Sequence, residues 1–111
     1  MSVSRLSKLL QFMEQDPKDP FILYALATEY NNLDNTAEAF RFYLKLVAEH
    51  PSYVGTYYHL GKLYEKQDET AQAITTYQQG MEAARNKRDM HAFSELQGAF
   101  NSASGLDYED D

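Results

Sequence analysis

Apolar residues recur along the 111-residue chain at intervals of three and four, which is the spacing of one face of an α-helix. Short polar segments separate six such stripes. The pattern therefore predicts an all-α fold with about six helices. The stripes are Leu6, Leu9, Leu10 and Met13; Leu23, Leu26, Ala27 and Tyr30; Ala39, Phe40, Tyr43 and Leu46; Tyr57, Leu60, Gly61 and Tyr64; Ala73, Ile74, Tyr77 and Met81; and Phe93, Leu96, Phe100 and Ala103.

The polar segments contain residues that favour helix ends. NNLDNT at 31–36 and EKQDET at 65–70 both offer Asp and Thr, whose side-chain oxygens accept hydrogen bonds from unpaired first-turn amides. We expect the Asp and Thr residues of both segments, Asp34 and Thr36 and then Asp68 and Thr70, to suit helix starts in this way. The three prolines, Pro17, Pro20 and Pro51, are predicted to lie between helices, where the missing amide proton is tolerated.

The sequence repeats itself with a period of 34 residues. Ten positions align under this shift, and nine of the ten pairs are identical. A period of this length is typical of stacked helical hairpins. The pairs are Pro17 and Pro51, Tyr24 and Tyr58, Leu26 and Leu60, Ala27 and Gly61, Tyr30 and Tyr64, Asp34 and Asp68, Thr36 and Thr70, Ala37 and Ala71, Ala39 and Ala73, and Tyr43 and Tyr77.

These repeated positions resemble the tetratricopeptide repeat family, whose unit is a 34-residue helix–turn–helix. The resemblance implies a right-handed α–α superhelix, a solenoid of about six antiparallel helices. Arg85 stands where the family's closing proline is expected, so the second helix of the second repeat is predicted to continue toward Asn86. The expected domain spans 1–105, with an N-terminal helix at 1–16, repeat one at 20–50, repeat two at 54–87, a C-terminal capping helix at 89–104 and a flexible acidic tail at 106–111.

Gly61 interrupts a helical stripe, at a cost of about 1 kcal/mol relative to alanine. Small residues in such a repeat mark the places where two helices cross closely. A bulky side chain at Gly61, Ala27, Ala39 or Ala73 would therefore separate the helices and lose contacts along both. We predict that these four residues belong to the core.

Charge and composition narrow the classes of partner. The chain has a formal net charge of −7, and four of its acids lie in the final DYEDD. This sign opposes binding to nucleic acid and to anionic membrane surfaces. The chain has no cysteine, no secretory leader pattern and no run of about 20 apolar residues. We expect a cytoplasmic protein that binds neither nucleic acid nor membrane.

No constellation of residues predicts catalysis. His50, His59 and His91 lack metal-ligand spacing, and the five glycines form no phosphate-binding loop. His50 is expected to play a structural role at a helix end, where positive charge is favourable. The sequence therefore predicts a protein that is not an enzyme and that uses no metal or cofactor.

One side of the first helix in each repeat is the candidate binding surface. Tyr24, Thr28 and Asn31 lie about 100° around the helix from the core stripe, and the same geometry recurs one repeat later. The family resemblance implies that this side lines a concave groove, which takes up a peptide or helix of another protein. The competing interpretation is that both tyrosines only pack against neighbouring helices. The predicted groove residues are Phe21, Tyr24, Thr28, Asn31, Tyr58, Lys62 and Glu65.

Two other roles stay open. The first or last helix can pair with another copy, which makes the protein a self-assembling homo-oligomer. The acidic tail can dock near Lys62 and Lys66 as an internal competitor. Some members of the family that this sequence resembles clamp a chaperone's C-terminal carboxylate with lysine and asparagine side chains. Here those positions are occupied by Tyr24, Thr28 and His59, so we do not expect such a clamp.

Overall fold

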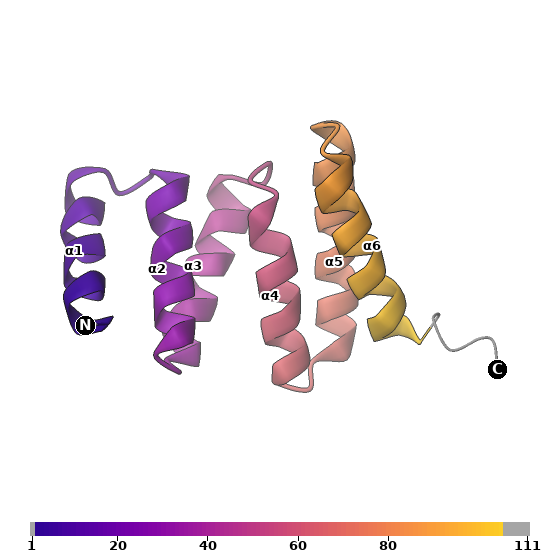
Figure 1. The fold of residues 1–111 in the computed structure, drawn as a ribbon, viewed down its shortest axis with the longest axis horizontal. Coiled ribbons are helices and arrows are strands. Elements are labelled where there is room, and N and C mark those ends of the chain that lie inside the picture. Colours follow the sequence, from indigo (N-terminus) through magenta and orange to yellow (C-terminus); the bar gives the residue numbers. More distant parts are fainter. Residues whose placement is uncertain (1, 106–111) are drawn as a thin grey trace. The chain divides into compact units, whose positions relative to one another are not determined.

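The computed structural model describes residues 2–105, with side chains from residue 5 onward, and all regular structure in this range is α-helical (Figure 1). The predicted all-α class is confirmed. The predicted tail at 106–111 lies outside the described residues. The helices are α1 (Ser2–Gln15), α2 (Pro20–Asn32), α3 (Thr36–Glu49), α4 (Gly55–Lys66), α5 (Thr70–Asn86) and α6 (Met90–Ser104).

The chain forms two compact units, and the first is Met1–Pro51. Here α1 packs on α2, and α2 packs on α3. The 3.6-residue periodicity of α2 and α3 turns their apolar stripes toward each other, so both helices bury one face. The fully buried side chains of this unit are Leu23, Leu26, Ala27, Ala39, Phe42, Tyr43 and Leu46.

The second unit is Ser52–Asp111. Its helices α4 and α5 form one antiparallel hairpin, and α6 packs on α5 with a smaller contact to α4 (Figure 1). Helix α5 ends at Asn86, as the absence of a closing proline predicted. The buried apolar side chains of this unit are Tyr57, Leu60, Leu63, Ala73, Tyr77, Ala84, Leu96 and Ala99.

The predicted small residues do lie at helix crossings. Ala27, Ala39 and Ala73 are completely buried. A Cβ atom added to Gly61 would stand 2.1 Å from Cε1 of Tyr77, a separation that no real contact has. Glycine at position 61 therefore allows the Tyr77 ring to lie directly against the backbone of α4, which confirms the prediction and explains the residue.

Gly80 has the same role, although sequence reasoning treated it as one of several scattered glycines. A Cβ atom at this position would lie 2.5 Å from Cβ of Tyr57 and 3.0 Å from Cδ2 of Leu96. Helix α5 therefore meets α4 and α6 closely at one point. Because nothing in the 34-residue alignment pairs Gly80 with another small residue, its role was not visible from the repeat.

The predicted stripe on α3 is wrong in one position. Phe42 is buried, although the predicted stripe does not include it, and Phe40, which the stripe does include, is only half-buried. The reason is that Phe42 stacks on Tyr30 of α2, with ring centroids 5.7 Å apart and planes at 11°. The buried arc of α3 is thus wider than the stripe that the sequence pattern selected.

The turns within the two repeats correct the predicted role of Asp34 and Asp68. Neither aspartate provides the helix cap, and both adopt a left-handed backbone conformation with φ near 61°. In the first repeat the cap is Asn35, whose Oδ1 accepts from the amide of Glu38 at 3.3 Å. In the second repeat Glu69 occupies the cap position without a side-chain bond. Short polar residues tolerate the left-handed region better than most, which accounts for aspartate there.

The turn between α5 and α6 repeats this geometry. Arg88 has a φ of 59°, and the amide of Asp89 donates to the carbonyl of Ala84 at 2.9 Å. The amides that follow Asp34 and Asp68 make the equivalent bond at 2.9 and 2.8 Å. All three turns therefore close the preceding helix in one way, through a bond that satisfies an orphan carbonyl. Helix α6 follows α5 as the second helix of each repeat follows the first.

Within residues 2–105, no helix is both long enough and apolar enough to cross a membrane.

Candidate partner-binding surface

In the first unit, the predicted surface residues lie along α2. Phe21 follows the helix cap, where Asp19 Oδ1 accepts from its amide at 2.9 Å, and its side chain is 66% exposed. Tyr24 is half-buried, with its ring edge-to-face on Tyr43 at 6.4 Å between centroids. Asn31, also half-buried, ends the row. The ring contact fixes Tyr24 while leaving part of its side chain in contact with solvent.

Thr28 in the same row is joined to the core. Its Oγ1 lies 3.3 Å from the hydroxyl of Tyr43, a buried residue of α3. Burial raises the pKa of the Tyr43 hydroxyl, and the bond to Thr28 partly opposes this shift. The surface of α2 therefore rests on a polar contact to the core as well as on apolar packing.

In the second unit, the corresponding residues lie along α4. Tyr58 is half-buried, and Lys62 Nζ stands 5.5 Å from the centre of its ring, within the range of a cation–π contact. Lys62 Nζ is also 3.9 Å from Oε2 of Glu65. Tyr58, Lys62 and Glu65 thus form one connected row on α4, as their spacing predicted.

Glu65 also makes a contact with the core. Its Oε2 accepts a hydrogen bond from the hydroxyl of Tyr77, which is completely buried. Burial raises the pKa of Tyr77, and the bond and negative charge of Glu65 raise it further. The spacing along α4 places Glu65 on the surface but does not indicate this contact, because the depth of Tyr77 depends on the missing side chain of Gly61.

The histidines have structural surroundings. His50 ends α3, and its Nε2 lies 2.7 Å from the backbone oxygen of Lys18, so the imidazole joins two segments of the first unit. His59 stands beside Tyr58, and burial lowers the pKa of its imidazole while the charge of Glu95 opposes that shift. The described part of the chain contains no group of three or more His, Cys, Asp or Glu side chains that is arranged to hold a metal ion.

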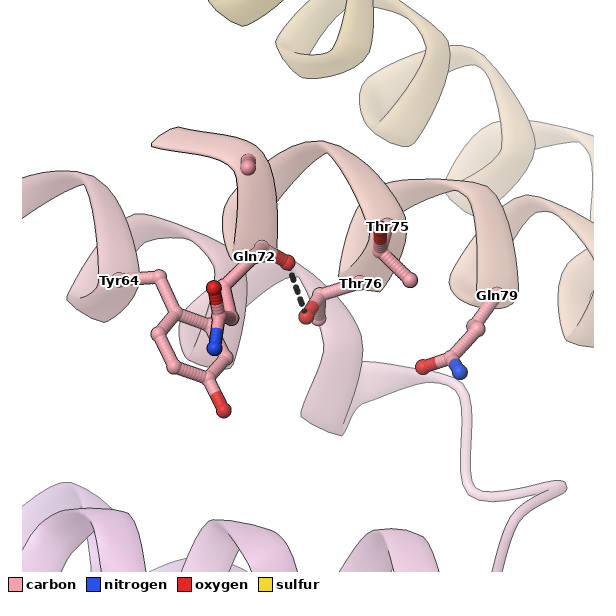
Figure 2. A pocket seen from close by; sticks show the side chains of 6 residues that line it. Tyr64, Gln72, Thr75, Thr76 and Gln79 are labelled. Atoms are coloured by element: carbon pink, nitrogen blue, oxygen red, sulfur yellow. Dashed lines mark hydrogen bonds between the residues drawn. The ribbon is translucent and has the colours of Figure 1, made fainter. Parts of the chain in front are cut away.

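A shallow pocket in the second unit was missed by the sequence analysis (Figure 2). It has a volume of about 400 Å³ and is lined by Tyr64, Ala71, Gln72, Thr75, Thr76 and Gln79. Thr76 aligns with Phe42 under the 34-residue shift, so a small residue replaces a buried ring. The positions at which the two repeats differ, rather than those at which they agree, would have indicated this site.

Three comparisons place the chain among known proteins. A tetratricopeptide repeat family model matches residues 54–87. The solution NMR structure of a tetratricopeptide repeat domain protein from Salinibacter ruber is 50% identical, with a TM-score of 0.77 over 86% of this chain and 97% of that chain. A crystal structure with the same description and organism is 52% identical, with a TM-score of 0.76 over 79% of this chain and 99% of that chain.

More distant similarity concerns the fold alone. The crystal structure of MamA protein is 20% identical, with a TM-score of 0.70 over 94% of this chain and 59% of that chain. No curated protein matches this sequence. The helices of the described residues pack pairwise as in tetratricopeptide repeats, and half of the aligned residues are shared with the Salinibacter domain. The chain therefore belongs to the tetratricopeptide repeat family.

Proposed function

We propose that this protein is a non-catalytic interaction module that binds a peptide or helix of another protein through the exposed sides of α2 and α4. Tetratricopeptide repeat domains generally mediate protein interactions and typically carry no catalytic activity. The proposed binding residues are those that share one repeat register, together with the exposed ring at the start of α2. They are Phe21, Tyr24, Thr28, Asn31, Tyr58, Lys62 and Glu65.

The most direct evidence for this proposal is that neighbouring side chains hold the two tyrosines in position. Tyr24 is held by the Tyr43 ring, and Tyr58 is held beneath the Lys62 ammonium, yet both keep part of their surface in solvent. A partner that binds a side chain already fixed in position loses little further conformational freedom. Tyrosine is enriched among the residues that dominate binding energy, because it offers large contact area with few rotatable bonds.

Phe21 adds an apolar contact at the beginning of α2. An exposed fraction of 66% is high for a phenylalanine, and burial of this ring in a complex would remove apolar surface from water. Lys62 and Glu65 next to Tyr58 supply both signs of charge, which suits a partner segment of mixed polarity. The proposal therefore favours an amphipathic segment over a uniformly charged one.

The test compares two double variants in an affinity pull-down read by mass spectrometry. Tyr24→Ala with Tyr58→Ala is expected to lose a partner that the wild type retains. The matched control is Leu44→Ala with Gln78→Ala, because these residues are exposed, lie on the second helices and are also related by 34 residues. Thermal unfolding of both variants establishes that they are folded. Equal capture by the two double variants would contradict the proposed surface.

Self-assembly is the second candidate function, and one observation favours it. Phe12 on the N-terminal helix is 52% exposed, although it lies on a helix that already packs against α2 on its other side. A second copy that covered this ring would remove apolar surface from water. Sedimentation velocity across a hundredfold concentration range tests this role, and a wild-type dimer that Phe12→Ser converts to monomer would support it.

A further inference from the structure

The end of α5 and the turn that follows it concentrate positive charge in an acidic protein. Three of the ten Lys and Arg residues lie within residues 85–88, which we call the basic cluster, although the whole chain has a net charge of −7. Arg85, Lys87 and Arg88 are all exposed. The equivalent turns within the two repeats contain acidic residues and no cation. The proposed function makes no use of this cluster.

Arg88 has a backbone conformation that arginine rarely adopts. Its φ is 59°, and the residues in the two equivalent turns are Asp34 and Asp68, each with a φ of 61°. Aspartate is one of the non-glycine residues that are enriched in this left-handed region, and arginine is not. The fold therefore favours aspartate at a position where the chain has a long cation. A residue held in a sparsely populated conformation points to a role outside the fold.

The charges of the basic cluster are only partly neutralised by its neighbours. Arg85 Nη1 lies 3.1 Å from Oε1 of Glu82. Asp89 is engaged in the cap of α6, where its Oδ1 accepts from a first-turn amide at 3.1 Å. In the part of the chain that the structure describes, neither Lys87 nor Arg88 forms an ion pair with an acidic side chain. Two adjacent cations can therefore receive carboxylates from another segment.

Met90 extends this surface with an apolar side chain. It is the first residue of α6, and its side chain is 59% exposed. One turn further along α6, the Arg85 guanidinium lies 5.1 Å from the ring centre of Phe93. A thioether makes favourable contacts with aromatic rings. The surface therefore suits an acidic segment that also carries an aromatic residue.

Residues 106–111, the acidic segment, have this composition. Their sequence is LDYEDD, with four acids and one aromatic residue, Tyr108. Helix α6 separates this segment from the basic cluster of its own chain, because the cluster lies at the beginning of α6 and the segment follows its end (Figure 1).

The length of α6 decides which copy of the cluster the segment can reach. The helix has 15 residues and is therefore about 22 Å long. Six residues span at most about 20 Å when they are fully extended. Only a segment that ran straight back along the whole helix would bring even its last residue to Arg88, and its other acids would fall short. The basic cluster of a second copy is under no such restriction.

We propose that the acidic segment of one copy binds the basic cluster of a second copy, with carboxylates against Lys87 and Arg88 and the ring of Tyr108 against Met90. The two surfaces differ, so the contact is heterologous and joins copies head to tail. Exposed ion pairs are individually weak, so a dissociation constant in the millimolar range is expected. The contact uses neither the row on α4 nor Phe12, so it is independent of both candidate functions.

The test is a concentration series of the full isotope-labelled chain, followed by NMR at the amides of residues 87–90. The wild-type signals are expected to shift with concentration in a saturable way. A variant with an uncharged segment is expected to lose at least about fivefold in association constant. The four changes in this neutral-segment variant are Asp107→Asn, Glu109→Gln, Asp110→Asn and Asp111→Asn.

General repulsion between copies predicts the opposite result for this variant. The four changes remove negative charges from a protein with a net charge of −7, so repulsion between copies decreases. Weaker association of the neutral-segment variant therefore supports a specific contact. Equal or stronger association of this variant, or no saturable shift in the wild type, would overturn the proposal.

Changes at the turn separate loss of the contact from loss of the fold. Arg88→Asp introduces the residue of the other two turns, so it is expected to retain or raise the melting temperature while association weakens at least about fivefold. Lys87→Glu with Arg88→Asp is expected to abolish association. Adding Glu109→Lys and Asp110→Lys to that variant is expected to restore association at the net charge of the wild type. A folded variant with all four changes that did not associate would refute the pairing.

Two other arrangements give different spectra. If the acidic segment binds α4 of its own chain, the amides of Lys62 and Lys66 differ between wild type and the neutral-segment variant at every concentration, and those of residues 87–90 do not. A peptide of sequence LDYEDD is expected to shift residues 87–90 of the neutral-segment variant. Shifts with a short thymidine oligonucleotide and none with the peptide would assign the cluster to nucleic acid. Either of these results would overturn the assignment to a second copy.

Discussion

The two repeats differ in the small residue at the helix crossing and in the side chain that the buried tyrosine contacts. In the first, Ala27 lies at the helix crossing, and the Tyr43 hydroxyl meets Thr28 at 3.3 Å. In the second, Gly61 lies at the same position, and the Tyr77 hydroxyl bonds Glu65 instead. Thr28 and Glu65 are not equivalent under the 34-residue shift, since Thr28 aligns with Lys62.

A single methyl group distinguishes the two helix crossings. The Tyr77 ring occupies the space in which a Cβ at position 61 would stand, with Cε1 and Cζ 2.1 and 2.6 Å from that point. Ala27 carries a Cβ at the equivalent position, and the hydroxyl of Tyr43 meets Thr28 rather than Asn31, which is the equivalent of Glu65. The repeat with Gly at this core position and the repeat with Ala there therefore differ in the surface side chain that the buried tyrosine contacts.

The largest effect is expected from a side chain at the glycine crossing. Gly61→Leu should reduce the free energy of unfolding by about 2 kcal/mol or more, because overpacking outweighs the gain of about 1 kcal/mol in helix propensity. Urea unfolding followed by circular dichroism measures the change. Gly98→Leu is the control, since a Cβ there meets nothing within 4 Å, and it should stabilise the protein by about 0.5–1 kcal/mol. Equal midpoints for wild type and Gly61→Leu would refute the placement of Tyr77.

High pH should destabilise the protein through its buried tyrosines. Burial and then the Glu65 bond raise the pKa of Tyr77 above its ordinary value of 10.0. The unfolded chain therefore ionises first, so this contribution to stability is complete below pH 10 and falls above it, by about 1.4 kcal/mol per pH unit. Unfolding free energies at pH 9, 10 and 11 should fall less steeply in Tyr77→Phe than in wild type. Identical slopes would contradict this role of Tyr77.

The fold was predictable because the information for it is spread over many positions. The stripe of Leu23, Leu26 and Ala27 is enough to identify the buried face of one helix. The 34-residue alignment independently supports the position of each polar segment between helices. The fate of Gly61 was also predictable, since a glycine in a helical stripe needs a compensating contact. What the alignment could not give is the identity of that contact, because the path of the Tyr77 ring depends on atoms from two helices.

The candidate site was only partly predictable for a related reason. Spacing along one helix placed Tyr58, Lys62 and Glu65 in a row, which is a local property. The pocket beside Tyr64 is lined by Thr76, which replaces the phenylalanine of the first repeat, and a comparison that looks for identical positions does not reveal such a difference. The Asp34 turn was misjudged because side-chain chemistry favours capping and the left-handed conformation equally at aspartate.

Removing each tyrosine hydroxyl should sharpen the contrast between the repeats. Tyr77→Phe removes a bond to a carboxylate and is expected to cost about 1 kcal/mol at pH 7. Tyr43→Phe removes a bond to a threonine and is expected to cost about 0.5 kcal/mol. Both values are modest because Glu65 and Thr28 reach solvent and can be hydrated in the variants. Chemical denaturation at constant ionic strength measures the two costs, and a larger loss for Tyr43→Phe would reverse the comparison.

The smallest change in stability is expected from substitutions in the turns, where the two repeats have the same backbone conformation. Asp34 and Asp68 both hold a φ of 61°, a conformation that glycine adopts without the steric cost of a Cβ. Asp34→Gly and Asp68→Gly should each stabilise the protein by about 0.5 kcal/mol, and by equal amounts, since the backbone bond that follows each turn is also the same. Asp19→Gly provides the contrast, because Asp19 has a φ of −67° and its side chain caps α2, so this change should destabilise the protein by about 0.3 kcal/mol. Melting temperatures of the three variants and the wild type test this prediction. Unequal increases for Asp34→Gly and Asp68→Gly would mean that the repeats differ at the turns as well as at the helix crossing.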